Sequence, residues 1–238
     1  MRQIRAVLFD LGGTLYDYGS LAPGDGENLV ALIREAGGDY PPDRIHRAYR
    51  AALKRVFYAY LPRSFYFHRD LFQDAILATA AELGVSLPQE LLARYRQAQR
   101  AWRLHHFAWR EGAIETLEAL RSRGYRLGIV SNIDDAQLAQ MVELGRLDRY
   151  VDFLLSSEQA RSCKPDQRIF VAALRQAGCT ASEALFVGDS LLQDVAGANR
   201  AGLRSVLLWH RLDREPPQRE PRPHYIIRRL PEVLQLVS

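Results

Sequence analysis

The sequence is poor in cysteine and in lysine, and it has no long apolar run. Cys163 and Cys179 are the two cysteines in 238 residues, which argues against a disulfide scaffold and favours a reducing, cytoplasmic setting. No apolar run reaches the roughly 18–20 residues of a membrane-spanning helix. The N-terminal stretch meets Asp10 too early for a secretory signal. These absences predict a globular cytoplasmic protein that does not associate with membranes.

The charge is balanced rather than strongly basic. The chain carries 32 basic and 28 acidic residues, and the basic ones are scattered beside acids at helical spacing. This pattern is typical of a solvated surface, so we expect no nucleic-acid partner. Among the basic residues only Lys54 and Lys164 are lysines. A lysine at a functional position in so arginine-rich a chain therefore suggests that its ammonium group is needed.

The chain falls into three parts. Residues 5–10 include the continuous apolar run AVLF, as in a strand covered on both faces. Residues 18–108 have the periodicity of four amphipathic helices. Residues 109–238 alternate helices and strands, which predicts a doubly wound parallel sheet with right-handed crossovers. We therefore expect an α/β, Rossmann-like core formed by residues 1–17 and 109–238, with a four-helix bundle inserted at 18–108.

Chemically active side chains stand at the carboxyl ends of the predicted strands. Ligands of open parallel sheets bind beyond these ends. Two carboxylates, a hydroxyl, an amide and an ammonium group occur there, with a further carboxylate just beyond: Asp10, Asp189, Ser131, Asn132, Lys164 and Asp194. Packing alone rarely requires charges at several strand ends, so we expect a functional site at this edge.

Four short motifs at these strand ends resemble those of the haloacid dehalogenase (HAD) superfamily of hydrolases. They are FDLGGTLYD, IVSN, CKPD and VGDSLLQD, and their order and spacing fit the family over nearly the whole chain. The predicted helical bundle resembles the cap that many members carry between the first and second motifs. The resemblance implies a HAD-like core with an inserted helical cap.

The resemblance also implies a nucleophile and a metal site. Asp10 would attack the phosphorus of a phosphomonoester and form an aspartyl-phosphate intermediate. Mg²⁺ would be held by Asp10, Asp189 and the carbonyl of Gly12, with Asp194 orienting the site, because hard oxygen ligands suit this ion.

Further residues would contact the substrate. Ser131 would donate a hydrogen bond to a phosphate oxygen, and Lys164 would neutralise charge between the phosphate and Asp10. Gly13, Thr14 and Asn132 are further candidates, since a glycine turn lets backbone amides approach a phosphate. We expect a small phosphorylated metabolite as the substrate, and a monomer or homodimer.

Gly12 departs from the pattern of the family's phosphatases. Those enzymes usually have an aspartate two residues after the nucleophile, which protonates the leaving group and then activates water. General acid–base help is worth roughly 10²–10⁴-fold, so glycine here weakens catalysis without necessarily abolishing it. A good leaving group, the substrate itself or a cap residue could replace the acid. His105-His106, near the predicted return from the cap, is a candidate replacement.

Two other functions compete with a phosphatase. Haloacid dehalogenases also lack that aspartate, because a halide leaves without protonation, and they resemble this chain at Asp10 and Lys164. They use no metal, however, so Asp189 and Asp194 favour metal-dependent phosphate chemistry. The third hypothesis is a phosphate-binding protein with little turnover.

Overall fold

The computed structural model describes residues 3–17, 22–210, 213–216 and 220–237. The chain divides into two compact units, Met1–Asp17 with Ala108–Ser238, and Tyr18–Phe107. Residue 18, the expected first residue of the helical insertion, lies outside the described residues.

A parallel sheet forms the centre of the first unit. In the described part of the chain it has six strands: β1 (Ala6–Phe9), β2 (Arg126–Ser131), β3 (Phe153–Ser156), β4 (Ala184–Gly188), β5 (Arg204–Leu208) and β6 (Tyr225–Ile227). Their order is β3-β2-β1-β4-β5-β6, and every neighbouring pair is parallel. This confirms the predicted doubly wound sheet. The strand order reverses between β1 and β4, where such sheets hold their ligands.

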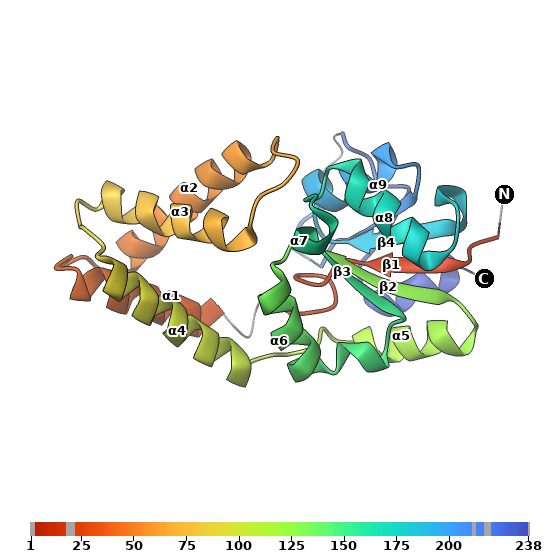
Figure 1. The fold of residues 1–238 in the computed structure, drawn as a ribbon, viewed down its shortest axis with the longest axis horizontal. Helices are drawn as coiled ribbons and strands as arrows, with labels where there is room; N and C mark the ends of the chain where they lie inside the picture. The colour runs from red at the N-terminus through yellow and green to blue at the C-terminus, as the bar shows by residue number, and fades with distance from the viewer. Residues whose placement is uncertain (1–2, 18–21, 211–212, 217–219, 238) are drawn as a thin grey trace. The chain divides into compact units, whose positions relative to one another are not determined.

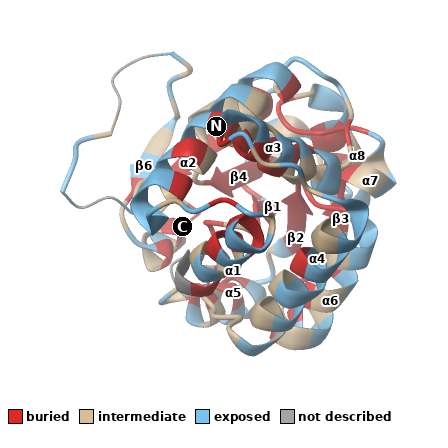
Figure 2. Ribbon diagram, turned by 90° about the vertical axis from the view of Figure 1, so that its left-hand side faces the viewer, coloured by how far each residue is buried: buried red, intermediate tan, exposed pale blue. Residues whose placement is uncertain are grey.

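Helices cover both faces of the sheet. Figure 1 shows α8 (Gln167–Ala177) and α9 (Ala196–Arg200) on one face, and α5 (Ala113–Ser122) and α6 (Asp135–Gly145) on the other. The short helix α7 (Ser157–Ala160) follows β3. Because both faces are covered, the apolar run of β1 is fully buried, as the interior of Figure 2 shows.

Shorter helical turns complete this unit. They are the 3₁₀ helices η2 (Leu147–Arg149), η3 (Ala181–Glu183) and η5 (Leu230–Gln235), and the π-helical turn η4 (Leu191–Val195). The last of these, η5, is 3₁₀ rather than α-helical. Its six residues include Pro231 in the first turn, and so short a segment favours the tighter i→i+3 hydrogen bonds.

The second unit consists of helices among its described residues. These are α1 (Ala22–Glu35), α2 (Pro42–Tyr60), α3 (His68–Glu82) and α4 (Gln89–His105). Helix α1 packs against α4, and α2 packs against α3. Their apolar stripes meet in a core that includes Leu29, Ile33, Ile45 and Ile76. No helix in the described residues combines the length and apolar character needed to cross a membrane.

Candidate active site

Strand pairing brings two carboxylates to the same edge of the sheet. β1 and β4 are neighbours with Phe9 opposite Val187, and the Asp10 N–H donates to the Val187 carbonyl at 2.9 Å. Asp10 and Asp189 therefore follow adjacent strands at their carboxyl ends. Each of Asp10, Asp189 and Asp194 contributes a carboxylate oxygen to a group whose members lie within 4.8 Å of one another.

Lys164 joins two of these carboxylates. Its Nζ donates to Asp10 Oδ1 at 2.6 Å and to Asp194 Oδ1 at 2.7 Å, and its side chain is only 1% exposed. Burial alone would lower the pKa of Lys164, but the two carboxylates raise it above its usual value. The ammonium group therefore stays charged and fills the narrow space between two acids.

Asn132 holds the backbone of Lys164. Its Nδ2 donates to the Lys164 carbonyl at 3.0 Å, and its Oδ1 accepts from the Lys164 N–H at 2.7 Å. Both ends of the buried amide are thus engaged by main chain. The sequence suggests Asn132 as a substrate contact, and the structure shows its amide bound to the main chain of Lys164.

The turn after Asp10 is shaped by Gly13. Its φ of 82° lies in the left-handed region, and a Cβ there would approach Asp189 Oδ2 to 2.4 Å. The next residue, Thr14, is fully buried, and its Oγ1 donates to Asp10 Oδ2 at 3.4 Å. The turn therefore packs directly against two acids, and Gly12 within it carries no side chain.

Asp194 and Ser131 also lie near the carboxyl ends of the strands. The Ser190 N–H donates to Asp194 Oδ2 at 2.9 Å, and the π-helical turn places Asp194 in the interior at 2% exposure. Ser131 ends β2 and is also buried. The structure thus gathers Asp10, Lys164, Asp189 and Asp194, and places Ser131 at the end of the strand beside β1.

The site carries more negative than positive charge. Burial raises the pKa of Asp189 to about 8; the charges of Asp10 and Asp194 add to the rise, and Lys164 and Arg110 oppose it. Burial likewise raises the pKa of Asp194 to about 6, although Lys164 opposes the shift. Three carboxylates share one ammonium group, so a divalent cation with a preference for oxygen ligands fits this cluster.

Arg110 is a site neighbour that the sequence analysis does not identify. Its Nε donates to the Thr14 carbonyl at 2.9 Å and its second guanidinium nitrogen donates to the Gly13 carbonyl at 2.7 Å. These contacts join residues 96 and 97 positions apart, so no local spacing reveals them.

The histidine pair suggested as a replacement acid lies at the end of α4. The His106 ring stacks on Trp102 at 3.5 Å between centroids, and its Nδ1 lies 2.9 Å from the Trp102 carbonyl. His105 is exposed. The His106 imidazole is thus engaged by Trp102 of α4.

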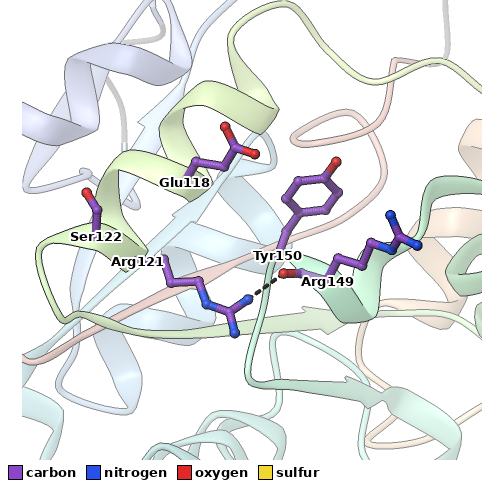
Figure 3. Close-up of a pocket in the computed structure, with 5 residues that line it drawn as sticks. All are labelled: Glu118, Arg121, Ser122, Arg149 and Tyr150. Carbon is purple, nitrogen blue, oxygen red and sulfur yellow. Dashed lines mark hydrogen bonds between the residues drawn. The ribbon is translucent and has the colours of Figure 1, made fainter.

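A surface hollow at the other edge of the sheet is shown in Figure 3. It is lined by Glu118, Arg121, Ser122, Arg149 and Tyr150, and the Arg121 guanidinium donates to the Arg149 carbonyl. The lining comes from the second half of α5, just before β2, and from the last residue of η2 and the residue that follows it, just before β3. It is therefore at the amino ends of these strands, away from the acidic cluster.

Comparisons with known proteins agree with this geometry. Residues 4–202 match the haloacid dehalogenase-like hydrolase family. The chain is 34% identical to ribulose-1,5-bisphosphate 5-phosphatase of Halopiger xanaduensis, over 85% of this chain and 83% of that protein. It is 30% identical to glyceraldehyde 3-phosphate phosphatase of Methanopyrus kandleri, over 98% and 97% of the two chains.

A solved structure shares the fold over the whole length. The HAD-hydrolase YfnB of Bacillus subtilis, whose crystal form contains magnesium, superposes with a TM-score of 0.80 at 20% identity, covering 100% of both chains. The family match spans most of the chain, and it confirms the resemblance seen in the four motifs. This protein therefore belongs to the haloacid dehalogenase-like hydrolase family.

Proposed function

We propose that this protein is a Mg²⁺-dependent phosphatase of a small phosphorylated metabolite, with Asp10 as the nucleophile. The observation that carries the proposal is the group formed by buried Asp10, Lys164 and Asp194 with partly buried Asp189 at the switch point of the sheet. The phosphatase names of two relatives support the same class of substrate.

Asp10 would form the covalent intermediate. One of its carboxylate oxygens attacks the phosphorus, the bond to the ester oxygen breaks, and the alcohol leaves with a proton from solvent or from the substrate. Water then cleaves the acyl phosphate, which returns the free carboxylate and releases inorganic phosphate. Lys164 pairs with Asp10 at 2.6 Å and would offset the charge of the phosphoryl group.

The surrounding residues would hold the phosphoryl group. Ser131 donates a hydrogen bond to one of its oxygens, and the backbone of Gly13 and Thr14 lines the approach. Asn132 acts through Lys164, whose main chain it holds on both sides. These roles place phosphate recognition on buried residues at a strand end and in the turns near it rather than on exposed loops.

The acidic cluster would hold the metal ion. Asp10 and Asp189 would supply carboxylate oxygens. Gly12 would supply a carbonyl, and Asp194 would orient the site through Lys164 and the Ser190 amide. When bound, Mg²⁺ supplies positive charge to a phosphoryl group that carries several negative oxygens. We propose that the helical unit serves as the cap that selects the leaving group and excludes water.

A second function is favoured by Gly12. Dehalogenation needs no acid for the leaving halide, so the missing aspartate suits a 2-haloacid as well as an activated phosphoester. The acidic cluster argues against this function, since a halide displacement gains nothing from three carboxylates around the nucleophile. Binding of phosphate without turnover is the third possibility.

The test is a substrate panel with and without Mg²⁺. Phosphoesters and 2-haloacids are offered to the native protein, Asp10→Asn, Gly12→Asp and the exposed control Glu143→Gln on α6. We expect Mg²⁺-stimulated phosphate release that Asp10→Asn abolishes and Glu143→Gln retains. Halide release that is independent of Mg²⁺ would favour the second function. Phosphate release that appears only in Gly12→Asp would show that the native protein is not chiefly a phosphatase.

A further inference from the structure

We propose that Arg110 is a positioning residue for the turn that follows the nucleophile. The structure assigns it to holding residues 12–14 in the shape that aims the Asp10 carboxylate. This inference rests on the proposed function for its catalytic consequence, and on the contacts of Arg110 for its structural part.

The guanidinium group spans two successive carbonyls. Nε donates to Thr14 and a terminal nitrogen donates to Gly13, at 2.9 and 2.7 Å. The side chain is 15% exposed, so these charge-assisted hydrogen bonds are largely protected from water. A planar fork with two donors fixes two neighbouring peptide groups at once, which a single ammonium group does not.

The turn needs an external support of this kind. Gly12 and Gly13 have no side chains to anchor them, and glycine has the widest backbone freedom of any residue. A larger residue at position 13 would be strained at this φ of 82° and would displace the Asp189 carboxylate, because a Cβ would lie 2.4 Å from its Oδ2. The turn has backbone hydrogen bonds of its own, from Gly13 N–H to the Tyr16 carbonyl at 2.9 Å and from Tyr16 N–H to the Leu11 carbonyl at 2.8 Å. These leave the Gly13 and Thr14 carbonyls to be held by Arg110 from another segment.

The support reaches Asp10 through Thr14. Because the peptide group is planar, holding the Gly13 carbonyl also fixes the direction of the Thr14 N–H. Holding the Thr14 carbonyl fixes the backbone from which its hydroxyl donates to Asp10 Oδ2 at 3.4 Å. Arg110 thus orients one oxygen of the nucleophile, while Lys164 holds the other.

Arg110 is itself held in place. Its N–H donates to the Leu15 carbonyl at 2.8 Å, and the Asp17 N–H donates to the Ala108 carbonyl at 3.0 Å. Asp17 Oδ1 lies 3.6 Å from the guanidinium group. The segments where the chain leaves and re-enters the α/β unit are therefore tied together beside the turn.

The catalytic test compares Arg110→Ala and Arg110→Lys with Arg123→Ala. Arg123 is a matched control, because its guanidinium group donates to the Leu234 carbonyl at 3.1 Å and is exposed. A misplaced reacting group costs up to about 10²-fold, so we expect kcat of both Arg110 variants to fall by about 10- to 100-fold, with KM changed far less. Added guanidinium ion should restore part of the rate to Arg110→Ala but not to Asp10→Asn.

The structural test is amide hydrogen exchange of the peptide covering residues 11–16, which requires no activity. We expect faster exchange there in both Arg110 variants and native exchange in Arg123→Ala. Exchange that stays native in Arg110→Ala would overturn the proposal. If the native protein turns over substrate, a kcat of Arg110→Ala that is no lower than the kcat of Arg123→Ala would also overturn the proposal. Failure of the proposed function would appear separately, as Asp10-independent or absent turnover, and the exchange result would then decide the role of Arg110.

Discussion

The pH dependence of folding stability should report the crowded carboxylates directly. Burial first, and then the charges of Asp10 and Asp194, raise the pKa of Asp189 from 3.8 to about 8 in the folded protein. A folded-state pKa above the unfolded one gives a contribution that is complete below about pH 4 and lost as the pH rises through about 8. Metal-free protein should therefore lose stability over this window, and Asp189→Asn should lose much less.

The size of the effect follows from proton linkage. While the folded protein keeps a proton that the unfolded chain has released, the free energy of unfolding falls by about 1.4 kcal/mol per pH unit. Between about pH 5 and about pH 8 this amounts to up to about 4 kcal/mol from Asp189 alone. Asp194, with a pKa raised by burial to about 6, adds a smaller loss at the lower end of the range.

The assay is urea denaturation in the presence of a chelator at several pH values. The free energy of unfolding is compared among the native protein, Asp189→Asn and the exposed control Glu143→Gln. Titrations that all three proteins share then cancel in the differences between them. By our proposal Mg²⁺ would bind the ionised carboxylates in place of their protons, so its addition should flatten the native curve. Equal slopes for the native protein and Asp189→Asn without metal would refute the reasoning.

Three further substitutions test individual contacts. Lys164→Met should lower the free energy of unfolding by about 3–5 kcal/mol near pH 8, because it leaves two buried carboxylates without their counter-charge; urea denaturation would contradict this if the loss matched that of Lys54→Met. Gly13→Ala should abolish Mg²⁺ binding by calorimetry, whereas Gly124→Ala, at the same φ of 82° but with no atom within 4 Å of its Cβ, should retain it; equal binding would show that the approach to Asp189 is unimportant. Asn132→Ala should cost about 1–3 kcal/mol by leaving the buried Lys164 N–H unpaired, and should lower kcat; native kcat would show that Lys164 needs no such support.

The strand ends could be predicted from sequence because their determinants are local. The apolar run before Asp10 and the alternation of helices and strands after residue 108 require a parallel sheet. The carboxyl ends of its strands then share one edge, which brings Asp10 and Asp189 together without any knowledge of side-chain packing.

Other features depend on contacts between distant residues. Arg110 follows the helical insertion in the sequence, yet it contacts the turn at Gly13 and Thr14, which precedes the insertion. No residue pattern around Arg110 in the sequence indicates this contact. The engagement of both ends of the Asn132 amide by Lys164 is equally non-local. Sequence motifs therefore predicted which groups gather at the site, but not which of them support the others.

The most direct test of the central claim is to identify the phosphorylated residue. Native protein is mixed with a labelled phosphoester and Mg²⁺, quenched in acid during turnover and digested, and the peptides are analysed by mass spectrometry. We predict one added phosphoryl group on the peptide that contains Asp10, lost in Asp10→Asn and after mild alkaline treatment. Phosphate release with the label on another residue, or with no labelled peptide at any quench time, would contradict the account.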